Sequence, residues 1–157
     1  MTEVRIVGIG SPFGDDQIGW AVIETLTESG MLDRFLPGRV DAICCGHEAG
    51  LLTQVATVRK AIVIDAMRSS SPVGSVHKIA IEDVLPESSL LSSHRIGIAQ
   101  AISLGRALSM LPPTLILYGI EIRDTASDEI HPDVRAAIAQ VLHAIALDLA
   151  TLVPDSA

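Results

Sequence analysis

Two adjacent carboxylates, Asp15 and Asp16, follow a glycine-rich loop where an apolar strand gives way to a predicted helix; residues 4–20 read VRIVGIGSPFGDDQIGW. Glycine loops between a strand and a helix usually hold phosphate, because the helix amides point at the anion. Two carboxylates would repel a phosphate and instead suit a cation or a proton-transfer site. A single carboxylate would be explained by its favourable interaction with the helix dipole, roughly 0.3–1 kcal/mol. With two, Asp15 can cap the helix and leave Asp16 available for chemistry.

Asp65 is the second candidate, because it interrupts the apolar run AIVIDAM at residues 61–67. A charge there is costly unless it is paired or solvated in a cleft. The structural alternative is a strand-end aspartate that caps the following turn through Ser69 or Ser70. The third candidate is His94, which precedes a helical pattern and, taken alone, is expected to be an exposed first-turn residue. Together, an imidazole and two carboxylates suit a divalent transition metal.

Further polar residues follow other predicted strands. His47 lies in the segment CCGHEAG, where the structural alternative is a polar loop residue, and Glu48 supports the start of the next helix. His131 resembles a helix-start residue, and the segment RDTASDE before it is interpreted as an ordinary solvated loop. No chemical role is assigned to the remaining histidines or to the aspartates of that loop, namely His77, His131, His143, Asp124 and Asp128.

Composition predicts a single domain, residues 1–157, with an aliphatic core, since 48% of the residues are apolar and only 3% are aromatic. The net charge of −8 argues against nucleic acid or an anionic membrane as a partner, because both require a basic face. Cys44 and Cys45 are expected to be core or near-core residues in a reducing compartment. The N-terminus lacks a signal-peptide pattern, and no apolar stretch reaches the roughly 20 residues that span a bilayer. A cytoplasmic protein is expected.

Strand-like and helix-like segments alternate, which is typical of an α/β layered domain. The predicted strands are Val4–Ile9, Arg39–Cys45, Ala61–Met67, the edge strand Val76–Ile81, and Thr114–Ile122. The predicted helices are Asp16–Glu28, Ala49–Val58, His94–Met110 and Pro132–Leu152, and Leu85–Ser93 is expected to be a mobile loop. We therefore expect a mostly parallel sheet with helices on both faces. Ligands bind such sheets at the carboxyl ends of the strands, where four segments should lie: Gly10–Asp16, Gly46–Glu48, Asp65–Ser70 and Ile122–Thr125.

In this order along the chain, the motifs GIGSPFGDDQIG, VIDA and SSH resemble those of the hydrogenase maturation endopeptidases. Proteases of this family remove the C-terminal extension of a [NiFe]-hydrogenase large subunit after nickel has been inserted. The resemblance implies a three-layer α/β/α sandwich, phosphorylase/hydrolase-like, around a mostly parallel twisted sheet. It also implies that the family's metal-contacting and catalytic side chains fall on Asp16, Asp65 and His94. Because the nickel arrives with the large-subunit precursor, no permanently bound cofactor is expected.

Two positions depart from the family pattern. Ser11 stands where the family usually has Asn after the second glycine of the first loop, and a serine can still donate a hydrogen bond. Gly46–His47 stands where the family often has a Gly-Thr pair, and the extra imidazole could alter contacts with substrate or metal. We expect Ser11, Gly46 and His47 to contact the substrate.

Two other functions are compatible with parts of the pattern. Gly8, Gly10 and Gly14 approximate a dinucleotide-binding fingerprint, but the third glycine falls one position late and two aspartates oppose a pyrophosphate. A non-enzymatic nickel-binding assembly chaperone would use the same three side chains, and only a cleavage assay distinguishes it from a protease. The standard hydrolase motifs G-x-S-x-G and H-E-x-x-H do not occur in the chain.

Overall fold

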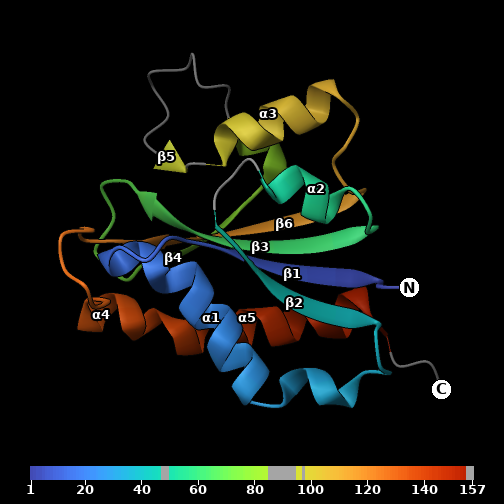
Figure 1. Cartoon of the computed structure of the whole chain (residues 1–157), viewed down its shortest axis with the longest axis horizontal. Coiled ribbons are helices and arrows are strands. Elements are labelled where there is room, and N and C mark those ends of the chain that lie inside the picture. The colour runs from blue at the N-terminus through green and yellow to red at the C-terminus, as the bar shows by residue number, and fades with distance from the viewer. Residues whose placement is uncertain (47–49, 85–94, 97, 155–157) are drawn as a thin grey trace.

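A mostly parallel sheet forms the centre of the computed structural model, which describes residues 1–46, 50–84, 95–96 and 98–154 (Figure 1). The strands are β1 (Val4–Ile9), β2 (Val40–Cys45), β3 (Lys60–Arg68), β4 (Val76–Ile79), β5 (Arg95–Ile96) and β6 (Thr114–Glu121). Strands β2, β1, β3 and β6 are parallel neighbours in that order, and β4 pairs antiparallel with β6. The short β5 pairs antiparallel with the end of β3. The carboxyl ends of four parallel strands therefore meet at one edge of the sheet.

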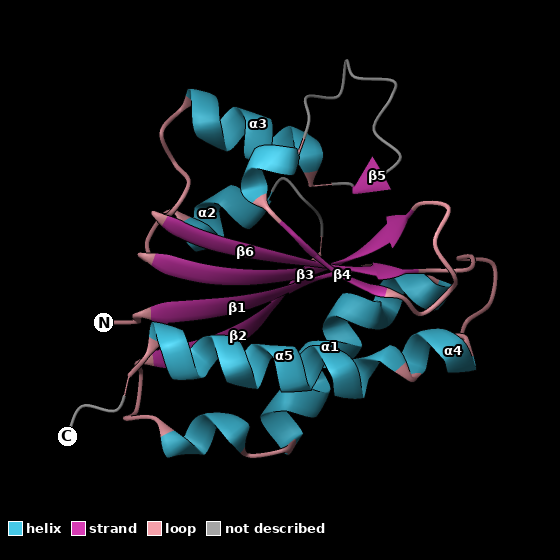
Figure 2. Cartoon of the chain, turned by 180° about the vertical axis from the view of Figure 1, so that it is seen from behind, coloured by secondary structure: helices cyan, strands magenta, loops and turns pink. Residues whose placement is uncertain are grey.

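Helices cover both faces of the sheet, and the expected α/β/α sandwich is confirmed (Figure 2). One face carries α1 (Ile18–Glu28), α4 (Pro132–Arg135) and α5 (Ala137–Leu152). The other face carries α2 (Leu51–Val55) and α3 (Ala99–Ala107). Short 3-10 helices lie in the connections, namely η1 (Gly14–Gln17), η2 (Met31–Arg34) and η4 (Ile81–Asp83).

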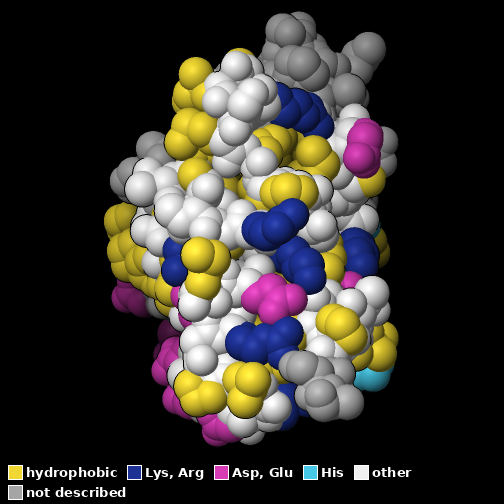
Figure 3. All heavy atoms as spheres, turned by 90° about the vertical axis from the view of Figure 1, so that its right-hand side faces the viewer, with side chains coloured by type: hydrophobic (Ala, Val, Ile, Leu, Met, Phe, Trp, Pro, Cys, Tyr) yellow, Lys and Arg dark blue, Asp and Glu magenta, His cyan; other side chains and the backbone are white. Residues whose placement is uncertain are grey.

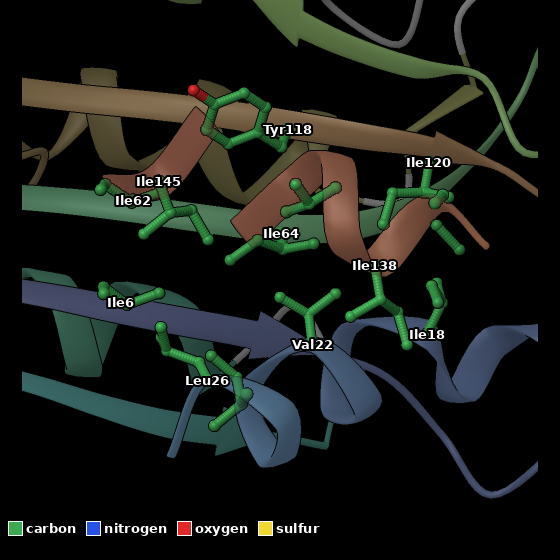
Figure 4. Packing of buried hydrophobic residues seen from close by; sticks show 14 of the residues in the cluster. Ile6, Ile18, Val22, Leu26, Ile62, Ile64, Tyr118, Ile120, Ile138 and Ile145 are labelled. Carbon is green, nitrogen blue, oxygen red and sulfur yellow. The ribbon is translucent and has the colours of Figure 1, made fainter. Parts of the chain in front are cut away.

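The core consists of two aliphatic layers, one on each face of the sheet. Side chains alternate along β3, so that Ile62 and Ile64 face α1 and α5, whereas Ala61 and Val63 face α2 and α3. Because both faces of β3 are covered, its residues from Ala61 to Met67 are all apolar except Asp65. Figure 4 shows the layer on the face of α1 and α5, in which isoleucines of the strands pack against those of the helices.

The C-terminal segment Pro132–Leu152, formed by α4 and α5, is the one part of the described chain that is long and apolar enough to cross a membrane. Its residues Val141, Ile145 and Leu149 are nevertheless buried in the core against the sheet. The apolar character of this segment therefore follows from its packing in the domain.

Several element boundaries differ from the sequence prediction: α2 ends at Val55 instead of Val58, and β4 ends at Ile79 instead of Ile81. The predicted helix Asp16–Glu28 begins as the 3-10 helix η1 before α1 starts. The predicted helix His94–Met110 is shorter, since Arg95–Ile96 forms β5 with the end of β3 and α3 begins later. The predicted mobile loop Leu85–Ser93 lies outside the described residues, as does His94.

The two cysteines have different environments. Cys45 is buried, as expected, but Cys44 is exposed, so that part of the prediction is wrong. Their strand, β2, lies at the edge of the parallel set, and its side chains are less covered than those of β1 and β3.

Candidate functional site

The carboxyl ends of β1 and β3 bring two predicted site segments to the same edge of the sheet. Gly8 of β1 is level with Ile64 of β3, so Asp65 lies at the height where β1 ends. The 3-10 helix η1, which follows β1 and carries Asp16, is in contact with β3. Asp16 and Asp65 thus share the edge at which parallel sheets bind their ligands.

Asp65 is almost fully buried, with 5% of its surface exposed. It shares a face of β3 with Met67, which is the face covered by α2 and α3. Its Oδ1 accepts a hydrogen bond of 2.8 Å from the N–H of Ala66. Ser69, one of the two residues through which Asp65 could cap the next turn, donates its N–H and its hydroxyl to Glu121 instead.

Glu121 is a buried carboxylate that the sequence patterns had not singled out. It ends β6, is 4% exposed and pairs with Met67 of β3. Its side chain accepts the N–H of Ser69 at 2.8 and 3.0 Å and the hydroxyl of Ser69 at 2.8 Å, which fixes the turn that follows β3. The signal that could have found it is the one used for Asp65, a charge that ends an apolar run, here TLILYGIE.

Asp15 is also buried, with 2% of its surface exposed, and its partners are distant in the chain. Its Oδ2 accepts hydrogen bonds from the N–H groups of Arg123 (2.8 Å) and Asp124 (3.2 Å). Its Oδ1 accepts one from the N–H of His131 at 2.6 Å. The expectation that Asp15 caps the first helix is wrong, since no side chain caps the start of η1. Asp15 instead binds the connection between β6 and α4.

That connection, residues 122–131, is docked on the first loop of the chain. The N–H of Asp15 donates to the carbonyl of Asp124 at 3.1 Å, and Nε2 of Gln17 donates to the carbonyl of Asp128 at 2.8 Å. The side chains of Asp124 and Asp128 are exposed. The interpretation as a solvated loop is therefore right for these side chains and wrong for the main chain, which is held against the predicted site.

A cavity of about 260 Å³ opens beside Asp15. Nη1 of Arg123 lies 2.8 Å from Nε2 of His131 at its wall. Nδ1 of His131 accepts the N–H of Asp133 at 3.2 Å, which confirms His131 as a helix-start residue. The rest of the lining comes from the same connection and from the start of α4, namely Asp124, Ser127, Glu129, Ile130 and Pro132.

Main-chain amides of the first loop are engaged within the protein. The N–H of Ser11 donates to the carbonyl of Asp16 at 3.3 Å, and the N–H of Asp16 donates to the carbonyl of Phe13 at 3.0 Å. The N–H of Asp15 is bound to the connection after β6, as described above. Amides engaged in this way are not free to hold a pyrophosphate, and two carboxylates next to them would repel it. This geometry disfavours the dinucleotide-binding alternative.

A sequence profile of the hydrogenase maturation proteases, HycI, matches residues 34–147, well over half of the chain. The chain belongs to the hydrogenase maturation protease family. It is therefore a peptidase, and the resemblance of its motifs is confirmed at the level of the family. The matched segment contains Asp65 and position 94, whereas the first loop with Asp16 precedes it.

Solved structures of the same kind share the fold of this protease. Hydrogenase-maturating endopeptidase HybD from Escherichia coli superposes with a TM-score of 0.71 and 20% identity, over 96% of this chain and 93% of HybD. HybD from Thermococcus kodakarensis superposes with a TM-score of 0.71 and 21% identity, over 95% of this chain and 99% of that HybD. A hydrogenase 2 maturation peptidase from Thaumarchaeota archaeon SCGC_AB-539-E09 superposes with a TM-score of 0.63 and 24% identity, over 94% of this chain and 98% of the peptidase. At such identities the likeness establishes the fold. No curated protein sequence matches the chain.

The residues expected to contact the substrate of this protease are described only in part. Ser11 is half-buried, and its N–H is used in the turn to Asp16. Gly46 follows β2 at the same edge of the sheet and is exposed, and beyond its chain neighbours no described residue lies within 4 Å of the place where a Cβ atom would stand. His47 lies outside the described residues.

Of the three residues expected to contact a metal, the structure describes the positions of Asp16 and Asp65 but not that of His94. Among the described residues, no three His, Cys, Asp or Glu side chains are grouped closely enough to hold a metal ion. Two carboxylates at the edge, one half-buried and one buried, supply hard oxygen ligands and proton acceptors. A third ligand from outside the described residues, or from a substrate, would be needed to complete a metal site.

Proposed function

We propose that this protease removes the C-terminal extension of a nickel-loaded [NiFe]-hydrogenase large-subunit precursor, and that it recognises the nickel bound in that substrate. The observation that carries the proposal is the placement of Asp16 and Asp65 at one edge of the sheet in a chain of this family. In this proposal, Asp16, Asp65 and His94 contact the nickel and thereby place the scissile bond.

His94 lies outside the described residues, and its inclusion rests on the resemblance of its SSH motif to that of the family. The described residue that follows it, Arg95, pairs with Arg68 at the end of β3, the strand that carries Asp65.

The proposed reaction is peptide hydrolysis beside a metal that belongs to the substrate. A water oxygen attacks the carbonyl carbon of the scissile bond, the C–N bond breaks, and a proton passes to the leaving amine. The substrate's nickel polarises the carbonyl or activates the water. One of the two carboxylates accepts the proton of the attacking water and returns it to the amine. Asp65, buried on the face covered by α2 and α3, is shielded from bulk water during this transfer.

The test is incubation of the protein with a hydrogenase large-subunit precursor, followed by intact mass measurement. The precursor is supplied in nickel-loaded and nickel-free forms. We expect the nickel-loaded form to lose one C-terminal peptide and the nickel-free form to keep its full mass. A nickel-binding assembly chaperone would bind the loaded precursor and leave its mass unchanged, and that result would reject the proposal.

A further inference from the structure

Asp15 is a buried carboxylate that accepts three main-chain hydrogen bonds, and the reaction proposed above does not use it. Both of its carboxylate oxygens are occupied, Oδ2 by the N–H groups of Arg123 and Asp124 and Oδ1 by the N–H of His131. With 2% of its surface exposed, it is almost fully withdrawn from solvent. We propose that Asp15 is a positioning residue, which locks the first loop to the connection 122–131 and so fixes Asp16 at the edge of the sheet.

A carboxylate suits this task because it only accepts hydrogen bonds, and the three groups that face it only donate. Hydrogen bonds from main-chain amides to a charged acceptor are stronger than those between neutral groups. The bound amides come from both ends of the connection, at Arg123 and Asp124 after β6 and at His131 before α4. One side chain therefore closes this connection into a fixed loop and ties it to η1.

Two further contacts hold the same pair of segments together independently of Asp15. Nε2 of Gln17 donates to the carbonyl of Asp128 at 2.8 Å and to the carbonyl of Gly14 at 3.0 Å. Gly14 has a positive φ of 52°, and a Cβ atom there would lie 2.8 Å from the carbonyl oxygen of Ser127. The first loop and the connection are thus in close main-chain contact, with Asp15 at the centre.

The lock acts on Asp16 because Asp16 is the next residue in the same short 3-10 helix. A rotation of η1 that released Asp15 would move the neighbouring carboxylate relative to β3, against which η1 packs. Displacements of about 1 Å in a reacting group cost roughly 10²-fold in rate. The inference rests on the proposed function for its kinetic consequence, whereas the lock itself is a property of the free protein.

Two variants of Asp15 and one control test whether its hydrogen bonds lock the first loop to the connection 122–131. Asp15→Ala removes both acceptor oxygens and with them all three hydrogen bonds. Asp15→Asn keeps the shape, but its Nδ2 cannot accept, so at least one amide loses its partner. The matched control is Asp148→Asn, a carboxylate whose side chain is 11% exposed and whose partners, Tyr118 and Lys78, belong to neither the first loop nor the connection 122–131.

We expect the turnover number for the nickel-loaded precursor to fall roughly 10²-fold in Asp15→Ala, with KM changed by less than about threefold, because a displaced group weakens the transition state more than binding. Asp15→Asn should be intermediate, and Asp148→Asn should cleave like the wild type at a temperature where every variant is folded. Hydrogen exchange on the free proteins should be faster at residues 124 and 131 in Asp15→Ala, faster at one or both of them to a smaller extent in Asp15→Asn, and unchanged in Asp148→Asn.

Several results would overturn the inference. One is an Asp15→Ala protein that cleaves as fast as Asp148→Asn; another is unchanged exchange at residues 124 and 131. If Asp15→Ala does not fold, Asp15→Asn decides, and a wild-type rate in that variant overturns the lock. If the wild type itself fails to cleave the precursor, the proposed function fails, and the exchange measurement alone then supports or overturns the lock.

Discussion

At the scale of residues, the carboxylates of the edge differ in burial and therefore in what their removal does. Asp16 is half-buried in a short 3-10 helix, whereas Asp65 and Asp15 are 5% and 2% exposed. Removing a partly exposed side chain leaves no core cavity, whereas removing a buried acceptor leaves its donors unpaired, which costs about 1–3 kcal/mol each. The roles of Asp15, Asp16 and Asp65 can therefore be distinguished by measuring, for each alanine variant, both the free energy of unfolding and the rate of precursor cleavage.

We predict that Asp16→Ala lowers processing of the nickel-loaded precursor at least 10²-fold, since it removes a proposed nickel contact. Its free energy of unfolding should stay within about 0.5 kcal/mol of wild type, as for other surface substitutions. Intact mass and urea unfolding measure the two quantities. Asp128→Ala is the matched control, because that side chain is an exposed carboxylate of the neighbouring connection. Equal processing by both variants would remove Asp16 from the site.

We predict that Glu121→Gln destabilises the protein by about 1–3 kcal/mol, because an amide nitrogen replaces an oxygen that accepts from Ser69. The urea midpoint should fall while the slope of the transition stays constant. Glu28→Gln, at an exposed position in α1, is the control and should change stability by less than about 0.5 kcal/mol. If the two variants unfold alike, the hydrogen bonds of Glu121 do not stabilise the turn after β3.

At the scale of elements, the sequence predicted the strands and helices, which depend on neighbouring residues, but not the contacts between residues that are distant in the chain. The apolar runs, and the glycine, proline and polar residues that bound them, predicted the four parallel strands and the edge strand to within about two residues. The positions of Asp16 and Asp65 at one edge followed from strand ends alone. The role of Asp15 could not be predicted, because its partners, Arg123 and His131, are more than 100 residues away. Neither could β5, since Arg95–Ile96 pairs only once β3 is in place.

The packing of α1 on β1 depends on two glycines. A Cβ atom at Gly19 would lie 2.0 Å from the carbonyl oxygen of Ile9, and one at Gly8 would lie 2.2 Å from the carbonyl oxygen of Gly19. We predict that Gly19→Ala destabilises the protein by more than about 3 kcal/mol, since main chain must shift to admit the methyl group. Thermal unfolding measures the effect, and Gly46→Ala, where beyond the chain neighbours no described residue lies within 4 Å of the added Cβ atom, should be nearly neutral. A neutral Gly19→Ala would contradict this close approach.

At the scale of the whole molecule, charges are arranged differently at the two edges of the sheet. The edge where the strands begin carries basic side chains gathered around acidic ones (Figure 3). There Glu3 binds Arg39 at 2.7 Å and Lys60 at 3.2 Å, which joins β1 to β2 and β3. The opposite edge carries the carboxylates of the candidate site. Ion pairs thus join three strands at the edge where they begin, and the opposite edge carries the two carboxylates that we propose contact the nickel of the substrate.

This arrangement predicts a pH dependence of stability. The hydrogen bond from Arg39, and then that from Lys60, hold the pKa of Glu3 below its ordinary value of 4.5. A lowered carboxylate pKa contributes stability above the unfolded value and loses it as the pH falls below about 4.5 through the folded value. The contribution of such partly exposed pairs is about 0.2–1 kcal/mol. Urea unfolding of wild type and Glu3→Gln should therefore differ near pH 7 and converge at acidic pH. A difference that grows on acidification would contradict the assignment.

Recognition of substrate-bound nickel is the central claim, and nickel X-ray absorption of the complex tests it most directly. The complex of wild-type protein with nickel-loaded precursor would be frozen before cleavage and compared with the free precursor and with the complex of Asp16→Ala. We predict that oxygen or nitrogen neighbours appear around the nickel in the wild-type complex and are reduced in number in the variant complex. A nickel environment identical in the free and bound precursor, in a sample that goes on to be cleaved, would contradict recognition through the metal.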